Sequence, residues 1–241
     1  MKLSKKLTPI VAGSALLLSG MAAPIAAQAE AGVSASMDVA SMYLWRGLDV
    51  SAGGPAVSGS LGWDSGMGFY VNTWASSGYA PSPGDGYGGY EWDVWAGYAG
   101  EFSGLSYDLS VWSIMYPEGD GSGSGDSING LQGGTEISLG LGYQDFSFSY
   151  TVNSGHRYTG EKDYSYITLG YAFGDFGVKF GKQDVDAPYS DWSHIDLSYS
   201  LTDAASVTLS KASKDAAPGA TPEEDPLIVF SYHIPLDLAK K

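Results

Sequence analysis

Histidine, serine and acidic side chains are the residues of this chain whose types and spacing could do chemistry. His156 lies between Ser154 and Asp163 in the sequence, and such a trio could hydrolyse an acyl or peptide bond. No G-x-S-x-G or comparable local signature accompanies it, so a hydrolase at the rim of the fold is kept only as an alternative. His194 and Asp196 are two positions apart, and the simpler role for His194 is that of a hydrogen-bonded residue in the wall of the fold.

A metal or cofactor site has little support in the sequence. The run Gly119–Asp126 could offer oxygen ligands to calcium, but it lacks the nonapeptide spacing of calcium-binding β-rolls, and we interpret it as a polar loop. The chain has no cysteine, hence no disulfide framework. We therefore expect no metal, no cofactor and no catalytic residue, that is, a protein that is not an enzyme.

The elements that must position these side chains are β-strands. In residues 135–143, Ile137, Leu139 and Leu141 alternate with Glu136 and small residues, which is typical of a strand with two different faces. Twelve such segments follow one another, at about 33–46, 55–63, 67–76, 90–98, 105–111, 135–143, 146–152, 163–173, 176–180, 194–201, 206–212 and 227–236. Long links alternate with short ones, as in a closed antiparallel transmembrane β-barrel with short periplasmic turns and long external loops. A soluble secreted β-protein is the alternative.

The two faces of these strands differ in a way that suits a membrane. One face is broad, apolar and partly aromatic, and the other is mostly Ser, Gly and Thr. We expect the apolar face to meet lipid and the polar face to line a lumen. The charged and histidine residues of the polar face are the pore-lining candidates: Asp38, Arg46, Glu91, Asp93, Asp108, Glu136, Lys179, His194 and Asp196.

Arg46 is the sharpest single position, because it is the only arginine in the first half of the chain. Its place at the top of the first expected strand predicts an interior cation paired with acidic neighbours such as Glu91 or Asp93. The alternative is an arginine at the external rim, with its stem on apolar surface and its charged head in water.

The N-terminus and the overall charge narrow the class further. Lys2, Lys5 and Lys6 precede an apolar stretch, residues 7–23, and Ala27-Gln28-Ala29 fits the cleavage rule of a secretory signal. We expect residues 1–29 to be a signal peptide and residues 30–241 to be the barrel, with an N-terminal membrane anchor as the alternative. Since 27 Asp and Glu outnumber 12 Lys and Arg, the net charge of −15 argues against nucleic acid as a partner.

A motif near the expected first strand connects the chain to a known family. Ser41, Tyr43, Leu44, Trp45, Arg46 and Gly47 match an S-x-Y-x-aromatic-R-G segment; further matches are Pro55-Ala56-Val57 with Gly59 and Leu61, Gly68-Phe69-Tyr70-Val71, Trp74-Ala75-Ser76, Glu91 with Asp93, Gly97-Tyr98 and Tyr116-Pro117. In these residues the chain resembles the TorF-type porin family, outer-membrane proteins also described as conserved hypotheticals. The resemblance implies a β-barrel and a channel of unknown substrate, and it brings no catalytic residues. The C-terminal tail, 234–241, departs from outer-membrane barrels in not ending on an aromatic residue.

Together these observations predict an outer-membrane porin, a passive diffusion channel for small solutes with a weak preference for cations. Its expected partners are outer-membrane lipid, lipopolysaccharide and small solutes or ions, in a Gram-negative cell. Two alternatives stay open: a non-conducting structural or adhesive barrel, and the rim-located hydrolase.

Overall fold

A computed structural model describes residues 31–77, 89–115, 135–153, 164–185, 191–213, 225–236 and 238, and these residues form an all-β fold. The strands are β1 (Gly32–Ala40), β2 (Leu44–Trp45), β3 (Leu48–Asp49), β4 (Ala56–Asp64), β5 (Phe69–Ser76), β6 (Glu91–Phe102), β7 (Leu105–Met115), β8 (Thr135–Tyr143), β9 (Phe146–Asn153), β10 (Tyr164–Phe173), β11 (Phe176–Val185), β12 (Trp192–Ser200), β13 (Ala205–Ala212) and β14 (Leu227–Leu236). No helix within the described residues is long and apolar enough to cross a membrane.

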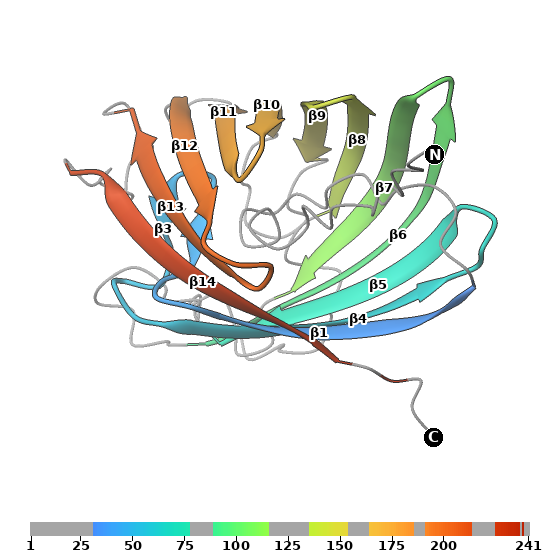
Figure 1. Ribbon diagram of the computed structural model, residues 1–241, viewed down its shortest axis with the longest axis horizontal. Coiled ribbons are helices and arrows are strands. Elements are labelled where there is room, and N and C mark those ends of the chain that lie inside the picture. The colour runs from blue at the N-terminus through green and yellow to red at the C-terminus, as the bar shows by residue number, and fades with distance from the viewer. Residues whose placement is uncertain are drawn as a thin grey trace, which may run out of the picture.

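Twelve of these strands close into one antiparallel barrel (Figure 1). From β4 to β14 each strand pairs with the next along the chain. β1 closes the ring, because its Ala40 pairs with Ala56 of β4 on one side and with Ser231 of β14 on the other. Closure leaves no edge of unpaired backbone N–H and C=O groups, as a hydrocarbon environment requires. The predicted closed antiparallel barrel of twelve strands is confirmed.

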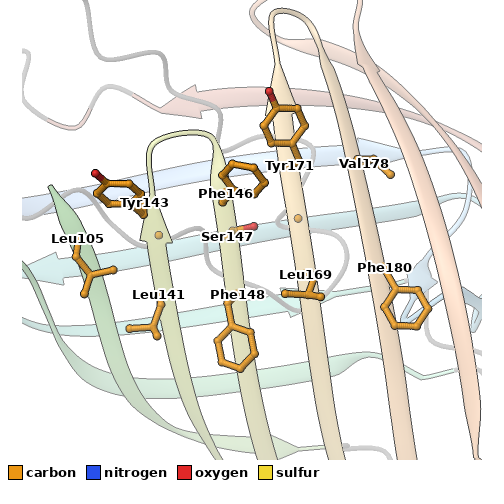
Figure 2. A pocket seen from close by; sticks show the side chains of 12 residues that line it. Leu105, Leu141, Tyr143, Phe146, Ser147, Phe148, Leu169, Tyr171, Val178 and Phe180 are labelled. Carbon is orange, nitrogen blue, oxygen red and sulfur yellow. The ribbon is translucent and has the colours of Figure 1, made fainter.

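The period-2 pattern sets which side chains face out. In β8 the side chain of Glu136 is buried, whereas its neighbour Ile137 is 43% exposed. Figure 2 shows the outside of β7 to β11, where Leu141, Phe148 and Leu169 stand on a shallow apolar groove of the outer surface. An apolar exterior around a polar interior is the arrangement of a transmembrane barrel and the inverse of a soluble one.

Aromatic rings gather on this outer face beside the short links. Phe173 and Phe176 flank the turn between β10 and β11, with their ring centroids 5.5 Å apart, and Tyr199 of β12 lies 4.7 Å from Phe176. Phe146 and Tyr171 form a similar pair at 4.7 Å. Such rings suit the interface between hydrocarbon and headgroups, so the end with the short turns carries one aromatic girdle.

The expected first strand, 33–46, is wrong at its C-terminal end. β1 ends at Ala40, and the chain then forms a separate small hairpin of β2 and β3, in which Trp45 pairs with Leu48. The apolar alternation continues through Tyr43 and Trp45 because a hairpin has the same period as a barrel strand, so the pattern could not mark the break. Tyr43 consequently lies buried inside, and not on the lipid face with Val33, Met37 and Val39.

Candidate functional site in the barrel interior

All nine residues expected on the polar face are buried. They are Asp38 on β1, Arg46 between β2 and β3, Glu91 and Asp93 on β6, Asp108 on β7, Glu136 on β8, Lys179 on β11, and His194 and Asp196 on β12. Since the opposite face of these strands carries the exposed apolar side chains, the nine belong to the interior. Their role as the lining of a conducting pore stays a prediction.

Arg46 sits at the tip of the β2–β3 hairpin, and its side chain reaches across to β8 and β11. Its Nη2 atom lies 2.7 Å from Oε1 of Glu136, and its Nη1 atom donates to Oε1 of Gln183 at 2.8 Å. The expected partners Glu91 and Asp93 are therefore wrong, because the chain turns inward after Ala40 and carries the guanidinium past β6 to β8 and β11. The planar fork of an arginine suits two acceptors held at fixed positions.

Aromatic rings enclose the same guanidinium. Its Cζ lies 4.4 Å from the ring centroid of Tyr166, 5.2 Å from that of Tyr164 and 4.7 Å from that of Trp45. A desolvated cation over aromatic faces is stabilised by about 2 kcal/mol. The hydroxyl of Tyr164 also donates to Glu136. The cation is thus held by charge, hydrogen bonds and rings together.

The tip of the hairpin has a tight two-residue turn. Arg46 and Gly47 both have positive φ, 48° and 84°, as the type I′ turn of a two-residue hairpin requires. Positive φ is uncommon for arginine, and the contacts of its side chain hold it there. A Cβ at Gly47 would collide with the side chain of His194, so this turn packs directly against β12.

The base of the hairpin is anchored to other parts of the ring. The hydroxyl of Tyr43 donates to Oε2 of Glu91 on β6 at 3.2 Å, and its ring meets Trp74 of β5 edge-on at 5.7 Å. Leu44 packs into a cluster with Ala40 and Val229 of β14. The hairpin therefore contacts both the β5–β6 wall and the β8–β12 wall, and it lies across the interior near the ends of the strands that carry the long links.

A second charged cluster lies on β11, β12 and β13. Nζ of Lys179 lies 2.9 Å from Oδ2 of Asp196, and Oγ of Ser210 donates to Oδ1 of the same carboxylate at 2.6 Å. His194 joins Asp196 through Nδ1 at 2.9 Å and the hydroxyl of Tyr166 through Nε2 at 2.7 Å. Tyr166, which also stacks on Arg46, links this cluster to the hairpin.

The wall formed by β5, β6 and β7 is aromatic and acidic. Trp95 and Trp112 stack with centroids 4.1 Å apart and an interplanar angle of 5°. On the same wall, the hydroxyl of Tyr70 on β5 donates to Oδ2 of Asp108 on β7 at 2.6 Å. Neither the stack nor this hydrogen bond was predicted, because a Trp or Tyr on the polar face of a strand has no local signal that names its partner.

Basic side chains and carboxyl groups are unevenly distributed within the described interior. Arg46 pairs with Glu136, Lys179 with Asp196, and His233 with Asp38 through Nδ1 at 2.8 Å. The remaining three carboxylates of the predicted set, Glu91, Asp93 and Asp108, have no such partner among the described residues and lie on adjacent strands. Oδ1 of Asp93 is buried and has no hydrogen-bond partner within the part of the chain that the structure describes. The carboxyl groups that have no cationic partner are thus concentrated on β6 and β7.

Three sequence-derived sites lie outside the described residues: the signal peptide 1–29, the Ser154, His156 and Asp163 trio, and the polar loop 119–126. Within the described ranges no group of three or more His, Cys, Asp or Glu side chains could hold a metal ion. Fold and interior together define a transmembrane β-barrel with a charged lumen that an inward hairpin crosses.

A comparison with known protein families places the chain in one of them. A family model described as "Bacterial protein of unknown function (Gcw_chp)" matches residues 25–218, and the chain belongs to this family. No curated protein matches significantly.

Solved structures resemble the chain in fold at low identity. A protein from a study of the in-meso crystallization of membrane proteins is 10% identical with a TM-score of 0.56, over 88% of this chain and 86% of its own. The KdgM porin is 9% identical with a TM-score of 0.47, over 86% and 99% of the two chains. A mutant porin of Rhodopseudomonas blastica is 13% identical with a TM-score of 0.41, over 75% and 55%. The first of these supports the barrel fold.

Proposed function

We propose that this chain is an outer-membrane porin of the TorF type, a passive channel for small solutes and ions with a weak preference for cations. Residues 1–29 would direct export, and the barrel would sit in the outer membrane among lipid and lipopolysaccharide. The observation that carries the proposal is a closed barrel with an apolar exterior whose interior holds nine buried ionisable side chains. Burying so many such groups is costly in a purely structural core and is expected along a path for polar solutes.

The cation preference rests on where the carboxyl groups without a cationic partner lie. Glu91, Asp93 and Asp108 face the interior on adjacent strands, while Arg46 and Lys179 are neutralised by Glu136 and Asp196. Carboxylates at a narrow passage lower the energy of a cation more than that of an anion. We therefore place the selectivity of the channel on the β6–β7 wall.

Recording from refolded protein in planar bilayers tests both statements. We expect channel currents, and in a KCl gradient a reversal potential of cation-selective sign that weakens at high salt, because the Debye length falls from about 10 Å at 0.1 M to about 3 Å at 1 M. Replacing Glu91→Gln together with Asp93→Asn should reduce the selectivity. Asp145→Asn with Asp175→Asn removes the same charge from two exposed short turns and should leave it unchanged.

Two outcomes would refute the proposal. Anion selectivity of the unmodified protein would refute the assignment of cation selectivity to the β6–β7 wall. Absence of conductance in repeated reconstitutions would favour a second candidate, the non-conducting structural or adhesive barrel, for which the hairpin lying across the interior is the specific supporting observation.

A further inference from the structure

The hairpin of β2 and β3 makes contacts around most of the barrel wall. Leu44 packs on Val229 of β14, Tyr43 on Trp74 of β5, and Arg46 on strands β8, β10 and β11. An element that touches opposite walls narrows whatever passage the wall encloses. All of these wall residues lie toward the ends of their strands that lead into the long links, so the narrowing is at that mouth.

The hairpin is braced internally as a unit. The amide of Val50 donates to the carbonyl of Tyr43 at 3.0 Å, and the amide of Tyr43 donates to Oγ of Ser51 at 2.9 Å. The carboxylate of Asp49 accepts from Oγ of Ser51 at 2.6 Å and from the amide of Gly53 at 2.6 Å. A hairpin with these internal hydrogen bonds can move away from the barrel wall, or back onto it, as one unit with those bonds intact.

Its attachment at the tip depends on few groups. Arg46 supplies the bonds to Glu136 and Gln183, its carbonyl accepts from Nε1 of Trp192 at 3.0 Å, and Gly47 packs on His194. The side chain of Arg46 is 3% exposed, so the charge of its guanidinium depends on Glu136 for compensation. Removing one partner of such a pair leaves a buried charge uncompensated, which is strongly unfavourable.

We propose that this hairpin is the constriction of the channel, and that the Arg46–Glu136 pair holds it in place and keeps the wall electrically neutral at that point. The inference rests on the proposed function and adds to it the element and the two residues that set the size and charge of the passage. While the pair is intact its charges cancel. When the hairpin moves away from the wall, Arg46 separates from Glu136, and the carboxylate of Glu136 is left unpaired in the passage.

Neutralising each member of the pair in turn tests this role of the hairpin in planar bilayers. Arg46→Gln and Glu136→Gln should both raise the single-channel conductance, because each releases the hairpin. Their reversal potentials in a KCl gradient should move in opposite directions: toward cations in Arg46→Gln, where Glu136 is left alone, and toward anions in Glu136→Gln, where Arg46 is left alone. The double variant should conduct like the single ones with the selectivity little changed. General loosening of the barrel would not produce shifts of opposite sign.

Matched controls and a measurement independent of current complete the test. Lys182→Gln removes one cation from an exposed position on β11 and should change neither value. Because the chain has no cysteine, Leu48→Cys supplies a single thiol on β3. We expect maleimide to label it at least about ten times faster when Arg46→Gln is also present, the factor that 1.4 kcal/mol of lost attachment produces.

Each outcome is decisive. Equal labelling rates with and without Arg46→Gln would overturn the role of the pair. Currents that are the same in the unmodified protein and all variants would overturn the hairpin as the constriction, while the proposed channel would stand. Faster labelling without current from any variant would overturn the proposed function itself, and with it the constriction.

Discussion

Arg46 and Glu136 are 90 positions apart in the sequence, and the guanidinium of the first lies 2.7 Å from the carboxylate of the second inside the barrel. The pair joins the hairpin after β1 to the start of β8. In the closed ring β1 lies between β4 and β14 and β8 lies between β7 and β9, so the pair connects two distant parts of the wall across the interior.

A double-mutant cycle should show that this pair acts as a unit. Arg46→Gln and Glu136→Gln are each expected to lower the free energy of unfolding by about 3 kcal/mol, since each leaves a buried charge without its partner. The double variant should lose clearly less than the sum. Denaturant unfolding followed by tryptophan fluorescence measures this, and additive losses would contradict the pairing. Lys182→Gln, whose pair with Asp184 is exposed, should cost about 1 kcal/mol or less.

Two interior glycines should respond differently to the same methyl group. A Cβ at Gly181 would collide with the Tyr166 hydroxyl and the His194 ring. These two groups are hydrogen-bonded to each other, so neither can easily move aside. We expect Gly181→Ala to cost about 1–3 kcal/mol through overpacking. Gly140→Ala is the control, because its Cβ would meet Asp108 at an ordinary 3.6 Å. Equal melting temperatures of the two variants would show that the Tyr166–His194 contact does not limit space there.

The lipid-facing assignment predicts an effect that depends on depth. Leu139 is exposed at the middle of β8, and Leu139→Arg should lower the free energy of unfolding in lipid vesicles by about 2–4 kcal/mol. Leu201→Arg, in the link between β12 and β13, should cost only about 0–1 kcal/mol because the side chain reaches the interface. Unfolding titrations in lipid vesicles compare the two, and a reversed order would show that the apolar face does not meet hydrocarbon.

The orientation in the membrane can be read from epitope tags. Tags inserted near Ser122, Gly160 and Ala217 should bind antibody on intact cells, since these positions lie in long links of the sequence. Tags near Ser65, Gln144 and Asp175 lie in short links beside the aromatic girdle and should bind only after the outer membrane is broken. The opposite pattern would invert the orientation, and equal exposure everywhere would remove the membrane assignment.

The sequence by itself determined the twelve strands of the wall and their faces, apart from the C-terminal end of the first strand. Alternation in residues 135–143 and 227–236 marked β8 and β14 to the residue, because side-chain direction in a strand has a period of two that neighbouring residues reveal. The same period placed Glu136, Lys179 and Asp196 inside, since an inward residue is recognised from its outward neighbours alone.

Only the tertiary structure decided which of those inward residues meet. The partner of Arg46 is Glu136 and not Glu91 or Asp93, and the side chain of Asp38 receives His233 from the far end of the chain. Such contacts depend on closure of the ring, on the register of twelve strands and on the inward course of the hairpin at Arg46 and Gly47. None of these is a local property, because a hairpin inside a barrel and a strand of its wall carry the same alternation.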